Sequence, residues 1–299
     1  MNEVLGADAA VGEEPPLPVL SAQVTELADG VFVGVSLNHS VGDGTAFWQF
    51  FNTWSEIHRL GIGEDDLLPE WFLESSPVPI PLPFRKLRHL IRRAESVRKL
   101  KARANAEMAG AGTDTTDSTI SSLQAVLAHL WRAVCRARRL APEQATSYTI
   151  IVGCRGRVRG VPAAGYISTA GEVEAKGLGG TAWLLNRAVA SFDEARVRET
   201  LERWVEAPDF AYAGRLSSLG TALVTGSSPR FDVFGNDFGW GKPLAVRSGP
   251  GNKVNGKATV FEGPGKGGSI SLEVCIAPDA LERLLADAEF MDAVTKPAA

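Results

Sequence analysis

The sequence predicts an α/β protein with mixed β-sheets in two lobes, and three patterns carry this prediction. Two short apolar runs lie within residues 19–37, and a run with helical spacing follows at 45–60. Strong helical patterns cover 118–140 and 181–205. The last third of the chain holds several short strand-like runs separated by turn residues. Strands and helices interleaved in this way are typical of sheets covered by helices.

Composition excludes several classes of protein. The 299 residues are 44% hydrophobic and 22% charged, and the formal net charge of −4 gives no indication of nucleic-acid binding. Residues 1–16 are acidic and lack the apolar core of a signal peptide, and no apolar run is long enough to cross a bilayer. The three cysteines are far apart, which argues against a disulfide framework or a zinc site. We expect a soluble cytoplasmic protein, a monomer if it folds, without a metal site.

The first elements lead into a distinctive hexapeptide. Strands are expected at Val19–Leu27 and Val31–Leu37, joined by a turn that contains Asp29 and Gly30. The second strand runs into HSVGDG at 39–44. The helix expected at 45–60 carries apolar residues at helical spacing, namely Phe47, Phe50, Phe51, Trp54 and Ile57. The hexapeptide therefore lies where a strand passes into a helix.

The middle of the chain predicts a linker and a strong helix. Residues 67–84 contain five prolines and little periodicity. Residues 85–103 carry nine basic residues against one acidic residue, which suits either a solvated helix or a surface that attracts an anionic substrate such as coenzyme A. A loop at 109–117 precedes the helix at 118–140, which either Ser121 or Ser122 can cap.

The remaining elements are short. A strand at 148–154 precedes a loop rich in glycine and alanine, and the helix at 181–205 follows. Further strands are expected at 222–224, 243–246, 258–262 and 269–276, and a last helix at 279–290 with Asp279 as its cap. Two glycine-rich stretches, 251–257 and 263–268, match nucleotide-binding spacings, but a strand rather than a helix follows each of them. We therefore interpret 263–268 as a hairpin loop and expect no nucleotide site.

Two clusters contain the residues best suited to chemistry. His39 stands at the end of an apolar strand, where active sites often lie, and Asp43 follows four residues later. A nearby carboxylate can fix the tautomer of an imidazole or anchor the loop itself. Gly42 and Gly44 permit close approach and unusual backbone angles. The second cluster, DFGWG at 237–241, places an aromatic residue between glycines. That pattern fits a shaped loop, a β-bulge or a strand crossing.

Together the two clusters resemble the signatures of one family. HSVGDG at 39–44 resembles the HxxxDG motif of the plant BAHD acyltransferases, and DFGWG at 237–241 resembles their second motif in the same order. The segments at 121–140, 152–158 and 271–276 fit as well, so the resemblance covers the chain from about Leu17 to its end. It implies a chloramphenicol-acetyltransferase-like fold of two α/β lobes with a channel between them. It also implies transfer of an acyl group from acyl-CoA to a hydroxyl or amine of a small-molecule acceptor, with no metal and no cofactor beyond the acyl-CoA co-substrate.

The same resemblance implies a role for each site residue. His39 is the general base, and no acyl-enzyme is needed. Asp43 and Gly44 support the site, and Asp43 pairs with Arg155, or with Arg157 as the second candidate. Asp237 and Gly239 shape their loop, and Trp240 offers its indole N–H to the channel or the oxyanion. Arg230 holds an acceptor carboxylate, as an arginine does at that place in some members.

The chain departs from the family pattern in two places. Only 38 residues precede His39, so we expect a chain truncated at its N-terminus, with an incomplete N-terminal lobe. The expected parts are 1–75 with HxxxDG, a crossover at 76–117, and a C-terminal lobe at 118–299 with DFGWG. Tyr166 and Ile167 stand where relatives carry a segment that ends in asparagine. Two alternatives to transfer stay open: an inactive homologue that binds coenzyme A or a protein, and slow hydrolysis of acyl-CoA.

Overall fold

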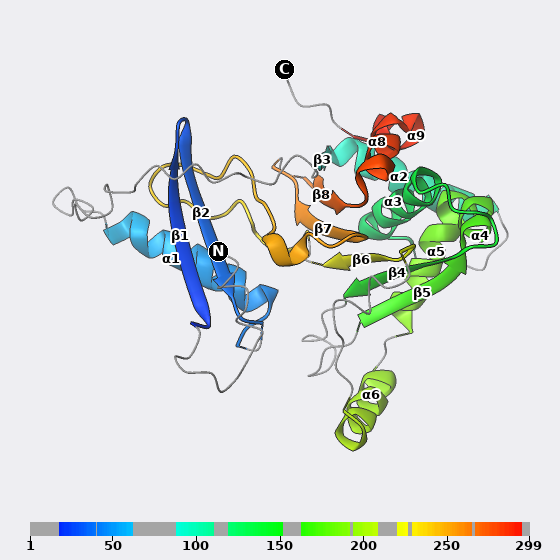
Figure 1. Ribbon diagram of the computed structural model, residues 1–299, viewed down its shortest axis with the longest axis horizontal. Coiled ribbons are helices and arrows are strands. Elements are labelled where there is room, and N and C mark those ends of the chain that lie inside the picture. The colour runs from blue at the N-terminus through cyan, green and yellow to red at the C-terminus, as the bar shows by residue number, and fades with distance from the viewer. Residues whose placement is uncertain are drawn as a thin grey trace. The chain divides into compact units, whose positions relative to one another are not determined.

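The computed structural model divides the chain into two compact units (Figure 1). It describes residues 18–39, 41–61, 88–110, 119–151, 163–191, 194–208, 220–226, 229–264 and 267–294. One unit comprises Met1–Pro81 and Phe231–Gly251, and the other comprises Leu82–Arg230 and Asn252–Ala299. The segment that contains DFGWG thus groups with the N-terminal residues, whereas the sequence placed it in a C-terminal lobe at 118–299. The reason is its packing on a helix of the first unit, described below.

The first unit begins with the expected hairpin and helix. Strands β1 (Leu20–Leu27) and β2 (Gly30–Leu37) pair antiparallel over their whole length. Leu27 pairs with Gly30, so Ala28 and Asp29 form a two-residue turn. Helix α1 (Gly44–Gly61) follows the hexapeptide. The prediction of a strand that passes into a helix at HSVGDG is therefore confirmed.

The second unit is built on a six-stranded mixed sheet. Its strands are β3 (Arg88–Arg92), β4 (Ala145–Ile151), β5 (Ala163–Thr169), β6 (Leu223–Gly226), β7 (Lys257–Glu262) and β8 (Ile270–Cys275). Their order across the sheet is β3-β8-β7-β6-β4-β5. The β4–β6 and β6–β7 pairs are parallel and the other pairs are antiparallel. The predicted α/β class with mixed sheets is confirmed.

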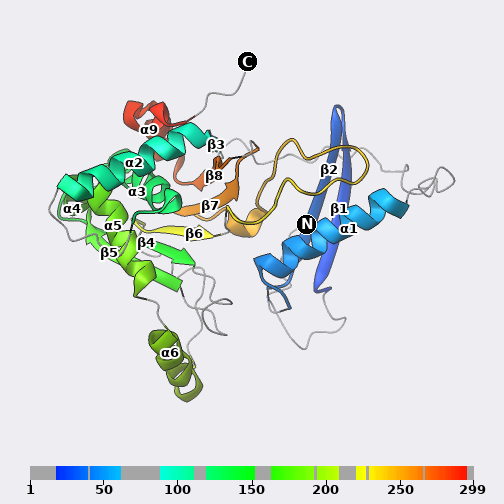
Figure 2. The same ribbon diagram turned by 180° about the vertical axis from the view of Figure 1, so that it is seen from behind.

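Helices pack against this sheet and share one hydrophobic core with it (Figures 1 and 2). They are α2 (Ala94–Gly110), α3 (Ser122–Ala137), α4 (Ala170–Ala175), α5 (Gly177–Ala190), α8 (Pro278–Ala286) and α9 (Ala288–Asp292). Helix α3 is the most deeply buried of them, and Trp131 near its middle is fully covered. Ser121, not Ser122, caps α3, because its hydroxyl accepts from the Gln124 N–H while the Gln124 side chain accepts from the Ser121 N–H.

Several predicted elements differ from the observed ones. The basic stretch at 85–103 is not a single helix, because Leu90 pairs with Leu272 in β3 before α2 begins. The helix expected at 181–205 is divided between α5 and α6 (Glu194–Glu206). Residues 243–246 form no strand. The helix expected at 279–290 is divided between α8 and α9. Asp279 does not cap α8; its carboxylate instead accepts a hydrogen bond from Arg283 Nη2 at 2.7 Å.

The glycine-rich stretch at 263–268 joins β7 to β8 as the predicted hairpin loop. Gly267 and Gly268 have φ angles of 102° and 92°, a conformation that side-chain-bearing residues rarely adopt. Strand β8 follows this motif, whereas a nucleotide-binding motif would be followed by a helix. Strand β7 likewise follows the stretch at 251–257.

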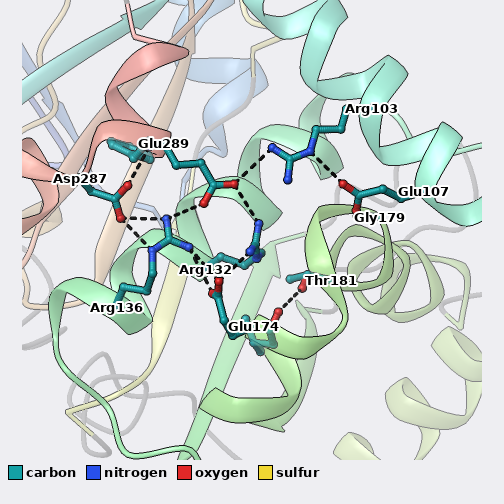
Figure 3. Close-up of polar contacts among 11 residues, drawn as sticks. Arg103, Glu107, Arg132, Arg136, Glu174, Gly179, Thr181, Asp287 and Glu289 are labelled. Atoms are coloured by element: carbon teal, nitrogen blue, oxygen red, sulfur yellow. Dashed lines mark hydrogen bonds and ion pairs between the residues drawn. The ribbon is translucent and has the colours of Figure 1, made fainter.

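An ion-pair network joins four helices of the second unit (Figure 3). Arg132 of α3, whose side chain is 8% exposed, contacts Glu174 of α4 at 2.8 Å and Glu289 of α9 at 3.2 Å. Glu289 also contacts Arg103 of α2 at 3.2 Å and Arg136 at 3.1 Å. Because each carboxylate serves more than one arginine, removal of either would leave the buried Arg132 charge poorly compensated. The network therefore fixes α9 and α4 to the central helix.

A second cationic cluster is buried next to this network. Arg92 is fully buried, and its Cζ lies 4.6 Å from the centre of the Phe290 ring. Among the residues that the structure describes, none forms a hydrogen bond with its three guanidinium nitrogens. His129 of α3 stacks on the same ring at 5.4 Å. Burial lowers the pKa of Arg92 to about 9. Burial, and next the Arg92 charge, lower the pKa of His129 to about 4. The cluster therefore favours a neutral imidazole.

We predict that His129 makes folding sensitive to acid. Its pKa falls from 6.5 in the unfolded chain to about 4 in the fold, so below pH 6.5 the unfolded chain binds the proton more tightly. His129 does not lower the free energy of unfolding above pH 6.5. As the pH drops towards 4, the free energy of unfolding falls, by about 3 kcal/mol at most. Urea unfolding between pH 4 and 7.5 measures this loss. His129→Asn should reduce its slope, and an unchanged slope in that variant would contradict the assignment.

Candidate active site

The turn between β2 and α1 presents His39. The residues on either side of it are held by backbone hydrogen bonds, because the Asn38 N–H donates to the Val19 carbonyl at 2.8 Å and the Val41 N–H donates to the Asn38 carbonyl at 3.1 Å. The His39 side chain is exposed. An imidazole at the end of a paired strand, in a turn pinned by the backbone, is in a position to meet a small molecule.

Asp43 begins helix α1. Its Oδ1 accepts hydrogen bonds from the N–H groups of Thr45 and Ala46, both at 3.0 Å, and its carbonyl accepts from the Phe47 N–H at 2.9 Å. This is the geometry of an N-cap, in which a carboxylate satisfies N–H groups that have no partner within the helix. Of the two roles that the sequence left open, Asp43 thus anchors the loop. Its predicted partners Arg155 and Arg157 lie outside the described residues.

The two glycines of the hexapeptide allow close packing. A Cβ atom on Gly44 would lie 2.9 Å from two ring carbons of Phe231, and one on Gly42 would lie 2.9 Å from Leu37 Cδ2. Neither glycine has a positive φ, so of the two expected properties the close approach is observed and the unusual backbone angle is not. Phe231 opens the segment that ends in DFGWG and belongs to the same unit.

The DFGWG loop winds around the side chain of its first residue. Asp237 Oδ1 accepts from the Gly239 N–H at 2.8 Å and from the Gly241 N–H at 3.0 Å. Both glycines have φ angles of 97°, which residues with a Cβ rarely adopt. The ring of Trp240 stands between them and is 52% exposed. Asp237 and its two glycines therefore determine the path of the loop.

Helix α1 provides the surface on which this loop lies. The Phe238 ring is buried, with its centre 5.5 Å from that of Phe51 and 5.0 Å from that of Trp54, both with edge-to-face geometry. Ser55 Oγ accepts from the Asp237 N–H at 3.3 Å, and His58 Nδ1 lies 2.9 Å from the Phe238 carbonyl. The helix that begins at the histidine motif therefore also holds the second motif, about two hundred residues away in the sequence.

The sequence interpretation missed three residues of this arrangement. It treated 45–60 as an apolar helix and gave no role to Asn52, Ser55 and His58, each of which contacts the backbone of residues 232–238. Their spacing of three residues was the available signal, since it places polar groups along one helix face. Arg230, expected to bind an acceptor, is exposed and belongs to the second unit.

Two classes of site are not seen among the residues that the structure describes. Within those ranges no three His, Cys, Asp or Glu side chains lie together as a metal ion would require. The helices in the same ranges are all too short or too polar to cross a membrane.

Comparison with known proteins identifies the family. The pattern of the Transferase family matches residues 2–67 and 84–291. An uncharacterized acetyltransferase of Arabidopsis thaliana is 34% identical over 92% of this chain and 67% of its own length. The BAHD acyltransferase DCR of the same plant is 30% identical over 92% of this chain and 62% of its length. The chain thus spans about two thirds of the length of these relatives.

Solved structures share the fold. TRI101 of F. sporotrichioides, complexed with coenzyme A and T-2, matches with a TM-score of 0.71 at 18% identity, covering 95% of this chain and 72% of that one. Vinorine synthase matches with a TM-score of 0.56 at 17% identity, covering 94% and 67%. These matches confirm the fold that the two motifs implied. The chain therefore belongs to the transferase family and is one of the BAHD acyltransferases.

Proposed function

We propose that this protein moves an acyl group from acyl-CoA to a hydroxyl or amine of a small-molecule acceptor, with His39 as the general base. The observation that carries the proposal is the exposed His39 in a turn pinned by β2 on one side and by the Asp43 cap of α1 on the other. Relatives support the type of reaction: a shikimate O-hydroxycinnamoyltransferase of Nicotiana tabacum is 24% identical over 88% of this chain and 68% of its own length.

The proposed chemistry needs one base and no covalent enzyme intermediate. Neutral His39 takes the proton of the acceptor hydroxyl or amine as the acceptor oxygen or nitrogen attacks the thioester carbonyl. The tetrahedral intermediate then collapses, the C–S bond breaks, and the imidazolium returns its proton to the departing coenzyme A thiolate. The products are the acylated acceptor and free coenzyme A, and the scheme requires no further cofactor.

The other site residues act through position in this proposal. Asp43 and Gly44 hold the turn that presents His39, and Asp237 and Gly239 hold the loop that presents Trp240. The Trp240 indole N–H donates to the oxyanion of the intermediate. Arg155 pairs with Asp43, and Arg230 holds a carboxylate of the acceptor.

We predict that His39→Ala lowers the transfer rate by about 100-fold or more, because the acceptor then lacks its base. Release of free thiol from acyl-CoA, with and without acceptor, measures the rate and separates transfer from hydrolysis. Val41→Ala changes an exposed residue of the same turn and serves as the matched control, with a rate within about twofold of the original. Full activity in His39→Ala would sink the assignment of the base.

A second prediction separates the two roles of Asp43. Loss of the cap in Asp43→Ala should lower the free energy of unfolding by about 1 kcal/mol. Asp43→Asn keeps a capping oxygen but removes the charge. If the cap is the main role, Asp43→Asn should match the original stability, as thermal unfolding can show. If Asp43→Asn is as unstable as Asp43→Ala, the charge is what matters and the cap is secondary.

A further inference from the structure

Three polar side chains follow one face of α1 and contact the loop segment in order. Asn52 Nδ2 donates to the Asp232 carbonyl at 3.0 Å, Ser55 Oγ accepts from the Asp237 N–H at 3.3 Å, and His58 Nδ1 lies 2.9 Å from the Phe238 carbonyl. Ser55 Oγ in turn donates to the Asn52 carbonyl at 2.8 Å. The contact of Asn52 holds the approach to the motif, whereas the contacts of Ser55 and His58 lie within the motif.

The chemistry of the His58 contact fixes its direction. A carbonyl oxygen can only accept a hydrogen bond, so His58 Nδ1 carries a proton and donates a hydrogen bond to the Phe238 carbonyl. The His58 ring also makes edge-to-face contacts with two rings of the loop. Its centre lies 5.7 Å from that of Phe238 and 5.5 Å from that of Trp240. Among the described residues, two rings contact the Trp240 ring. Phe238 belongs to the loop, and His58 lies outside it.

Asp237 holds the backbone on both sides of Trp240, and the indole extends from this stretch. Trp240 is flanked by Gly239 and Gly241, and glycine has the widest range of backbone conformations of any residue. The Phe238 carbonyl and the Gly239 N–H belong to one peptide group, so His58 and Asp237 together hold the peptide that precedes Trp240 by one residue. The half-exposed indole contacts His58 and Phe238.

We propose that His58 is a positioning residue for the transfer step, which places the Trp240 indole through its hydrogen bond to the Phe238 carbonyl and its ring contact. This inference rests on the proposed function, in which Trp240 faces the reacting carbonyl. A displaced donor loses much of its effect on a transition state even when substrates still bind. Replacement of His58 therefore lowers kcat more than it changes KM for acyl-CoA.

The loop should keep its place on α1 when His58 is replaced. The buried Phe238 ring still packs on Phe51 and Trp54, and the Ser55 contact to Asp237 remains. His58→Leu removes the donor and the aromatic ring. His58→Asn retains an N–H donor at a position close to that of Nδ1. Thr53→Val alters an exposed residue of the same helix and is the matched control.

The experiment follows Trp240 directly by fluorine NMR of protein labelled with 5-fluorotryptophan. The chain has seven tryptophans, and loss of one line in Trp240→Phe assigns the line of interest. We expect His58→Leu to move or broaden this line alone and to lower kcat about tenfold or more, with KM for acyl-CoA within about threefold. His58→Asn keeps the donor but not the ring, so it should restore kcat to within about threefold. Thr53→Val should change neither the line nor kcat.

Each outcome decides one claim. An unmoved Trp240 line in His58→Leu overturns the positioning of the indole, whatever the rates. A moved line with unchanged kcat, while His39→Ala is inactive, overturns the link to the transfer step and leaves the proposed function standing. Undiminished transfer in His39→Ala refutes the proposed base, and the fluorine spectrum still decides whether His58 places Trp240. No turnover by the original protein with any donor and acceptor overturns both the link to transfer and the proposed function.

Discussion

The seating of the DFGWG loop on α1 is the interaction on which the first unit depends. A buried Phe238 ring lies against Phe51 and Trp54, and the side chains of Ser55 and His58 form hydrogen bonds with the loop backbone beside it. This contact helps to group residues 231–251 with a hairpin and helix near the N-terminus. A second contact joins the same segments, because Gly44 leaves room for the Phe231 ring, two carbons of which would lie 2.9 Å from a Cβ at that position. Apolar burial brings the two motifs into one unit, and polar groups then fix their register.

The second unit is stabilised differently. Its sheet shares a core with α3, and a network of arginines and carboxylates fixes the outer helices to that core. Near the network, Arg92 and His129 both contact the Phe290 ring. Within the described part of the chain, no carboxylate forms a hydrogen bond with the Arg92 guanidinium. A buried cation without an anion is costly, and contact with an aromatic face recovers part of that cost. The neutral state of His129 is a consequence of this arrangement.

Sequence patterns predicted the hairpin, α1, α3 and the last strands because those segments have clear periodicity and turn residues. They failed where pairing in space overrides local preference: the charged Arg88–Arg92 becomes a strand because it pairs with β8, and β5 lies in a stretch of small residues without alternation. At the candidate site, motif spacing identified His39, Asp43 and the DFGWG loop. It could not show that α1 holds that loop, because the contacts of Asn52, Ser55 and His58 join residues about 180 positions apart.

The most direct test of this account is a double-mutant cycle between Trp54 and Phe238, whose ring centres are 5.0 Å apart. Unfolding free energies would be measured for Trp54→Leu, Phe238→Leu and the double variant. The account predicts a coupling of about 0.5–1.5 kcal/mol, as for other edge-to-face aromatic pairs. Effects that add to within about 0.3 kcal/mol would contradict it, because the second motif would then not be seated on the helix that begins at the first.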